Sequence, residues 1–267
     1  MRDGFMLFAF VMEDFQAQAR ANKGLFPKLG MLLIAQQDAL RGMIGGHVNL
    51  APVSLAASVR IALEARINFT YIVSSSFPYD NADLFVRYAD LQRLAHDEDK
   101  PPEERQLKAA ERQRLIELCG EWITTKKSGS LRFHYHWWAA NPDLERASLR
   151  DIARAAGLAK PYEQIYSVTS AFVHGSPLMK YGFEDESGRV APIGIALKCK
   201  QIAVLGFAYT LRCLQSACQF FGVPIDSVAL ALWQSQLVDA ARDALPNDFQ
   251  LESTLTPPHS EPRPASA

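Results

Sequence analysis

The stretch Val53-SLAASVRIALEARINFTYIV-Ser74 decides the fold class of this chain. Its apolar residues recur at helical spacing and cover most sides of one predicted helix, so we expect that helix to lie at the centre of the fold. The helix should end at the turn-forming sequence Ser-Ser-Phe-Pro that follows. Arg60, Glu64 and Asn68 stand four residues apart on it between apolar neighbours, which predicts that these polar side chains are partly buried.

Helical periodicity continues on both sides of this stretch. We expect a helix over residues 27–44 that ends at Gly45-Gly46, and a highly charged, mostly solvated helix over residues 103–124. The aromatic-rich residues 126–141 read as a loop. Further helices are predicted over residues 4–21, 80–96, 148–157, 161–174, 193–221 and 224–244.

This order of elements favours an all-α protein. We predict a multi-helix bundle with a small hairpin or loop excursion near residues 180–192. Residues 1–246 should form a single helical domain. The proline-rich residues 247–267 should form a disordered tail, because they hold too few apolar side chains to join a core.

The composition of the 267 residues is that of a globular protein, and it restricts the function classes. A formal net charge of -1 attracts neither nucleic acid nor anionic membranes, so any RNA contact must depend on a local site. The apolar runs are shorter than the roughly 20 residues of a membrane span, and we expect a cytoplasmic protein. No cofactor or metal is predicted. Free thiols are expected at all four cysteines, which lack paired or zinc-ligand spacing: Cys119, Cys199, Cys213 and Cys218.

A second polar ladder, Tyr166-x3-Ser170-x3-His174, precedes the helix-stop sequence Gly-Ser-Pro. His174 is therefore expected in the last helical turn, where the helix dipole favours a protonated imidazole. A partly buried Arg60–Glu64 pair needs further hydrogen bonds, which the second ladder could supply. We therefore expect the two ladders to share one interior site. The alternative is an intrahelical Arg60–Glu64 pair, with the Tyr166 and Ser170 side chains pointing to water.

Residues 133–138 are rich in aromatic side chains and form a second candidate region. Imidazoles at positions 134 and 136 could begin a metal-ligand set, but no third ligand stands at short spacing. Packing or an aromatic lining for a ligand is favoured instead, and we assign His136 and Trp137 to ligand binding.

Arg41-x5-His47 fits the Arg-x4-6-His spacing of helical ribonucleases in number. The predicted break at Gly45-Gly46 would separate the two residues on different segments. His174 has no Arg at the matching upstream positions. A Ser170–His174 nucleophile and base pair is sterically allowed at this spacing, although no oxyanion hole is marked.

Three motifs together carry a resemblance: Ser58-Val59-Arg60-x3-Glu64, Arg87-Tyr88, and Tyr166-x3-Ser170-x2-Val173-His174-Gly175-Ser176. Over residues 53–221 the chain resembles an all-helical bacterial family of unknown function, family 5677. The resemblance implies that Arg60, Glu64, Tyr166, Ser170 and His174 occupy the family's polar positions. We add Arg87 and Tyr88 to the predicted ligand-binding residues. The family is also distantly similar to the helical HEPN domains of toxin and phage-defence proteins, many of which cleave RNA.

Two functions follow as expectations. The first is a defence- or stress-associated protein, a metal-independent ribonuclease in which His174 transfers a proton and Arg60 stabilises phosphate charge. Its partners would be RNA at the local site and a second copy or another protein on the helix faces. The second is a non-enzymatic ligand- or protein-binding helical module in which the ladders are structural.

Overall fold

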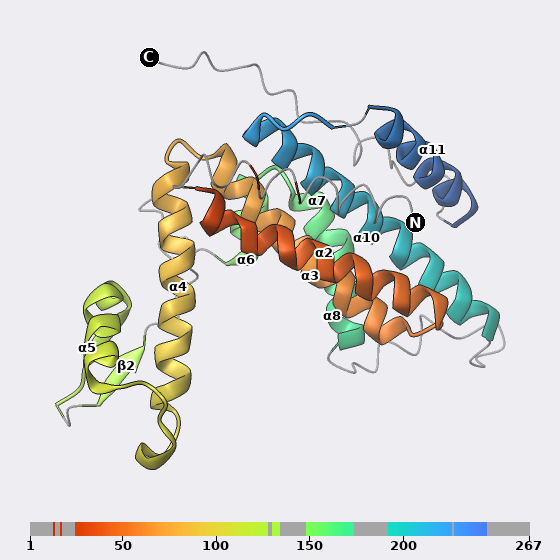
Figure 1. The fold of residues 1–267 in the computed structure, drawn as a ribbon. Helices are drawn as coiled ribbons and strands as arrows, with labels where there is room; N and C mark the ends of the chain where they lie inside the picture. The colour runs from red at the N-terminus through yellow and green to blue at the C-terminus, as the bar shows by residue number, and fades with distance from the viewer. Residues whose placement is uncertain are drawn as a thin grey trace. The chain divides into compact units, whose positions relative to one another are not determined.

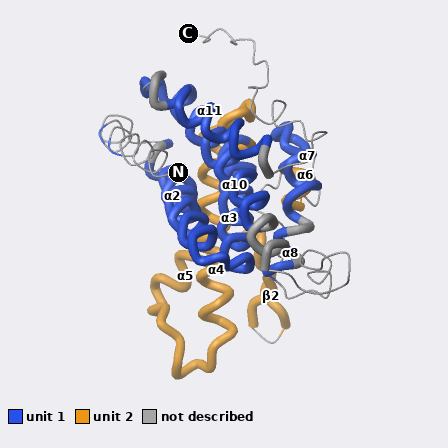
Figure 2. The backbone as a smooth tube through the Cα atoms, turned by 90° about the vertical axis from the view of Figure 1, so that its right-hand side faces the viewer, with its two compact units in different colours: residues 1–70, 153–267 blue, residues 71–152 orange. Residues whose placement is uncertain are grey.

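A computed structural model describes residues 25–127, 130–133, 148–173, 192–225 and 227–244, with positions 13 and 17. These residues belong to two compact units, distinguished by colour in Figure 2. Unit 1 consists of residues 1–70 and 153–267, and unit 2 of residues 71–152. The predicted all-α class is confirmed, because the described elements are helices apart from one pair of short strands. The single domain over residues 1–246 stays a prediction.

Unit 1 is built around the long helix α10 (Pro192–Phe221), which packs against α2 (Phe26–Val48) and α11 (Ser227–Ala244) (Figure 1). α3 (Pro52–Ser74) begins in this unit and ends in unit 2. The remaining described elements of unit 1 are α7 (Ala159–Pro161), the π-helical turn η3 (Tyr162–Tyr166) and α8 (Ser167–Val173). The predicted helices over residues 53–74 and 193–221 are confirmed almost to the residue.

α2 and α3 form a tight antiparallel pair. The Gln36 side chain donates a hydrogen bond to the Ala62 carbonyl, and nearer the connecting turn Gly46 lies against Leu55. The prediction that the helix over residues 27–44 ends at Gly45-Gly46 is wrong, since α2 continues to Val48. A β-carbon at Gly46 would lie only 2.9 Å from the Leu55 backbone nitrogen, so this glycine permits the close approach of the two helices.

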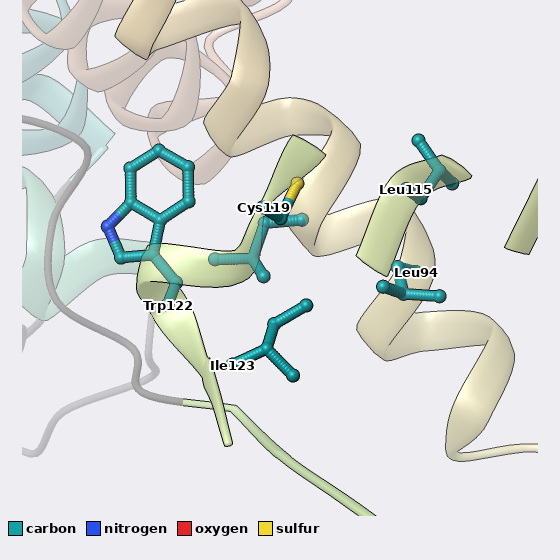
Figure 3. Close-up of a cluster of buried hydrophobic side chains, with 6 residues drawn as sticks. Leu94, Leu115, Cys119, Trp122 and Ile123 are labelled. Atoms are coloured by element: carbon teal, nitrogen blue, oxygen red, sulfur yellow. The ribbon is translucent and has the colours of Figure 1, made fainter. Parts of the chain in front are cut away.

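Unit 2 contains one small sheet among its helices. Strands β1 (Ile123–Thr125) and β2 (Leu131–Phe133) pair antiparallel, with Ile123 opposite Phe133. Four elements precede the strands: α4 (Pro78–Glu98), the 3-10 turn η1 (Pro102–Glu104), α5 (Ala109–Leu118) and the 3-10 turn η2 (Gly120–Trp122). The helix α6 (Leu149–Ala155) follows the strands and ends in unit 1. A buried cluster joins α4, α5 and the first strand, and its members are Leu91, Leu94, Leu115, Cys119, Trp122 and Ile123 (Figure 3).

The continuous helix predicted over residues 103–124 is wrong. The Asp97 carboxylate accepts hydrogen bonds from the backbone N–H groups of Gln106, at 2.7 Å, and Leu107, at 3.3 Å. These two bonds, that from Gln106 first, outweigh the effect of burial and lower the pKa of Asp97. They hold the chain in a non-helical conformation between η1 and α5.

The small sheet is a feature that the sequence did not predict. β2 lies inside residues 126–141, for which the sequence predicts a loop. The hairpin predicted near residues 180–192, the helix over residues 4–21 and the tail over residues 247–267 fall largely or wholly outside the described residues.

The contact of α10 with α2 and α3 generates a stability prediction. A β-carbon at Gly206 would meet the Met43 sulfur and the Val59 side chain. We expect Gly206→Ala to lower the free energy of unfolding by about 1–3 kcal/mol, because the packed neighbours must move. Gly45→Ala is the matched control, since nothing lies within 4 Å of a β-carbon there.

In the control, alanine should be neutral or stabilising by up to about 1 kcal/mol, as in an ordinary helix interior. Urea unfolding followed by circular dichroism measures both values. Equal effects of the two substitutions would contradict the close packing at Gly206.

Candidate functional site

The candidate site begins with an ion pair on α3. Arg60 Nε donates a hydrogen bond to Glu64 Oε1 at 2.9 Å, one helical turn further along. The side chains of Arg60 and Glu64 are 22% and 32% exposed, so the pair is partly buried, as predicted. This exposure leaves the pair within reach of a ligand from solvent.

Tyr166 joins this pair to the second polar ladder. Arg60 Nη2 donates a hydrogen bond to the Tyr166 hydroxyl at 2.7 Å, and Arg60 Cζ lies 4.7 Å from the centroid of the Tyr166 ring. The alternative in which Tyr166 points only to water is therefore wrong. The expected approach of the two ladders is seen at this position, although Arg60 and Tyr166 are 106 residues apart.

A π-helical turn positions Tyr166. The predicted helix over residues 161–174 is not regular, because η3 occupies its first part. The Tyr162 and Tyr166 rings stack in this turn, with centroids 4.7 Å apart and an interplanar angle of 18°. The Thr169 hydroxyl donates to the Ile165 carbonyl at 2.8 Å, which supplies a partner where the helix changes from π to α. Such turns often occur at functional sites.

The electrostatics of the site keep Arg60 charged. Burial disfavours the guanidinium charge, but the hydrogen bond and negative charge of Glu64, together with Tyr166, outweigh it and raise the pKa of Arg60. Glu64 also fixes the orientation of the guanidinium, because a charged hydrogen bond of this kind is stronger than a neutral one. The arrangement is a preoriented cation beside a phenol.

The structure describes only some of the other predicted site residues. Ser170 is half-buried on α8, one turn beyond Tyr166. His174 follows Val173, the last described residue of α8, and lies outside the described residues together with His136 and Trp137.

Arg87 and Tyr88 lie on α4 in unit 2. Arg87 pairs with Glu121 at 3.2 Å, and the Tyr88 ring meets the Trp122 ring edge-on with centroids 6.1 Å apart. These contacts give both residues a structural role, because they pack α4 against the turn before β1. Their predicted ligand-binding role stays a prediction.

The predicted break between Arg41 and His47 is wrong, since both residues lie on α2. Six residues along a helix place two side chains about 120° apart. Arg41 is paired with Asp38 at the surface, whereas His47 lines a small pocket of unit 1.

Sequence reasoning missed this pocket and a buried group around Arg66 on α3. The signal available for Arg66 was a charged residue between apolar neighbours, six positions after Arg60 and therefore on another side of the helix. Within the described residues, no three or more Asp, Glu, His or Cys side chains gather as metal ligands. None of the helices among the described residues has the length and hydropathy of a membrane span.

Comparison with known families identifies the larger part of the chain. The model of the family of unknown function DUF5677 matches residues 47–189, more than half of the 267 residues. The chain belongs to this family. The DUF5677 segment contains both polar ladders and excludes α10 and α11. Comparison with the curated proteins and with the solved structures gave no significant match.

The bond between Arg60 and Tyr166 predicts a specific loss of stability. Tyr166→Phe removes only the hydroxyl that accepts from Arg60, and we expect the free energy of unfolding to fall by about 1 kcal/mol. Tyr79→Phe is the control, because Tyr79 is 54% exposed and its hydroxyl should contribute little. Chemical denaturation of both variants measures the difference. An unchanged Tyr166→Phe protein would show that the hydroxyl does not stabilise the fold.

Proposed function

We propose that this DUF5677 protein binds RNA at Arg60, Glu64 and Tyr166 and cleaves it without a metal ion. The observation that carries the proposal is the Arg60 guanidinium, held by Glu64 at 2.9 Å and by the Tyr166 hydroxyl at 2.7 Å while remaining 22% exposed. A fixed cation of this kind stabilises negative charge that develops on a phosphate. The distant resemblance of the family to HEPN domains supports RNA as the substrate.

The chemistry is an attack of the ribose 2′-oxygen on the adjacent phosphorus. A base takes the 2′-hydroxyl proton, the O2′–P bond forms, the P–O5′ bond breaks, and an acid gives a proton to the departing 5′-oxygen. His174 fills one of these two roles and Glu64 the other. Arg60 stabilises the charge on the non-bridging oxygens, and Tyr166 keeps the guanidinium in place. The products are a 2′,3′-cyclic phosphate and a 5′-hydroxyl.

The test is cleavage of a fluorescently labelled RNA by the purified full-length protein in the presence of EDTA. We expect His174→Ala and Glu64→Gln to slow cleavage by about 100-fold or more, as for loss of a general acid or base. Arg60→Lys should also reduce the rate, because lysine cannot keep both hydrogen bonds.

Arg41→Ala is the matched control, since Arg41 is an exposed arginine paired with a neighbouring aspartate and should leave cleavage unchanged. An RNA with a single 2′-deoxy substitution at the cleaved position should resist. Equal cleavage by the wild type and His174→Ala, or cleavage of the 2′-deoxy substrate, would reject the mechanism.

A second candidate function, a ligand-binding module, is favoured by the pocket of unit 1. The pocket has a volume of about 130 Å³ and lies among α2, α10 and α11. Phe207, Trp233 and Leu237 give it an apolar lining, and His47 and Lys200 supply polar groups. Its size suits a ligand of about one aromatic ring.

The RNA experiment also separates the two candidates. In the binding module, the wild-type protein leaves RNA intact, and Arg60→Lys and Tyr166→Phe change only the stability of the fold. A protein partner or second copy on the helix faces remains a prediction in either case.

A further inference from the structure

A buried cationic group lies on the side of α3 that meets α10. Arg66 is 8% exposed, and its Cζ lies 5.3 Å from the centroid of the fully buried Tyr209 ring. Arg66 Nε and Nη1 are buried without a hydrogen-bond partner, and so is the Tyr209 hydroxyl. Buried donors without acceptors are rare in folded proteins, because a protein group, a water or a bound ion nearly always satisfies them.

A second arginine extends this group along α10. Arg212 follows Tyr209 by three residues, so the two side chains lie on neighbouring turns of one helix face. Arg212 is 6% exposed, and its Nη1 donates to Gln215 Oε1 at 2.8 Å. Burial, and then repulsion by Arg66, lowers the pKa of Arg212 to about 10. The two guanidinium groups are therefore close enough to repel each other.

The described ionisable neighbours of Arg66 do not neutralise its charge. Burial raises the pKa of Tyr209 to about 12 and that of Cys213 to about 12, with Arg66 opposing the rise in each case. Both groups are thus neutral at physiological pH. Among the described residues, no carboxylate lies within ion-pair distance of Arg66. The buried charge of Arg66, with the cation of Arg212 nearby, is costly unless an anion compensates it.

We propose that Arg66, Tyr209 and Arg212 form a binding site for a phosphate-sized oxyanion. The two guanidinium groups present N–H donors in planar forks that match oxyanion geometry, and the Tyr209 hydroxyl adds a third donor. Arg66 Nε, Arg66 Nη1 and the Tyr209 hydroxyl are themselves buried, so an anion bound to them would be shielded from bulk water.

This site is separate from the Arg60 cluster. Arg66 stands six residues beyond Arg60, so its side chain leaves α3 about 120° around the helix axis. The inference does not depend on RNA cleavage and can hold if that proposal fails.

The test measures the melting temperature of the full-length protein and the anion that it carries. After dialysis into chloride buffer, the protein is melted with sodium phosphate, adenosine 5′-monophosphate or sodium chloride at equal ionic strength. Phosphate released by acid denaturation of the dialysed protein is assayed in parallel. Phosphate near 100 times its Kd should raise the melting temperature by about 5 °C or more relative to chloride.

A site already filled after dialysis would instead release about one phosphate per chain. A shift with both phosphate compounds assigns the site to a terminal phosphate group, and a shift with inorganic phosphate alone assigns it to the free ion. Arg66→Met should abolish the shift and the released phosphate, and Tyr209→Phe should reduce them. Arg41→Met, which removes an exposed arginine, should behave as the wild type does.

Tyr209→Phe keeps the test informative if Arg66→Met does not fold. Absence of both the shift and the released phosphate in the wild type overturns the proposal. An undiminished phosphate effect in the foldable Arg66 or Tyr209 variant overturns it equally.

Discussion

The hydrogen bond from Arg60 to Tyr166 is the interaction on which the arrangement of the candidate site depends. It connects α3 with the last residue of the π turn η3 through a charged donor, and Glu64 also holds the same guanidinium. Because a partly buried cation needs such partners, the bond fixes where the π turn and α8 lie against α3. Ser170 on α8 lies one turn beyond Tyr166, the residue that this bond holds.

α3 combines two polar groups with an otherwise apolar surface. Arg60 belongs to a pair compensated by Glu64, and its pKa is raised. Arg66 faces α10, where burial lowers its pKa and no described carboxylate is within ion-pair distance. The first group has the features of a preoriented functional cation, and the second those of a site that requires an anion. One helix thus presents two kinds of electrostatic environment.

Much of the helical framework could be predicted because it depends on local patterns. The apolar periodicity of residues 53–74 and 193–221 marks α3 and α10 directly. The turn before α5 could not be found in this way, because the Asp97 carboxylate binds the backbone of Gln106 and Leu107 nine and ten residues away. The continuation of α2 past Gly46 likewise depends on packing against Leu55 rather than on helix propensity.

The candidate site was predictable in part for the same reason. Four-residue spacing marked Arg60, Glu64, Tyr166 and Ser170 as ladders, and the need of a partly buried ion pair for partners predicted that the ladders meet. The π turn that positions Tyr166 has no comparable sequence signal. The proximity of Arg66 to Tyr209 is a long-range contact, which helical periodicity does not encode.

A double-mutant cycle of Arg60→Met and Tyr166→Phe measures directly how much these two side chains stabilise each other. The free energies of unfolding of the wild type, both single variants and the double variant give the coupling between the two side chains. We expect a favourable coupling of about 1–2 kcal/mol, as for a hydrogen bond to a charged group. Additivity of the two substitutions to within about 0.3 kcal/mol would contradict it, because the side chains would then contribute to stability independently.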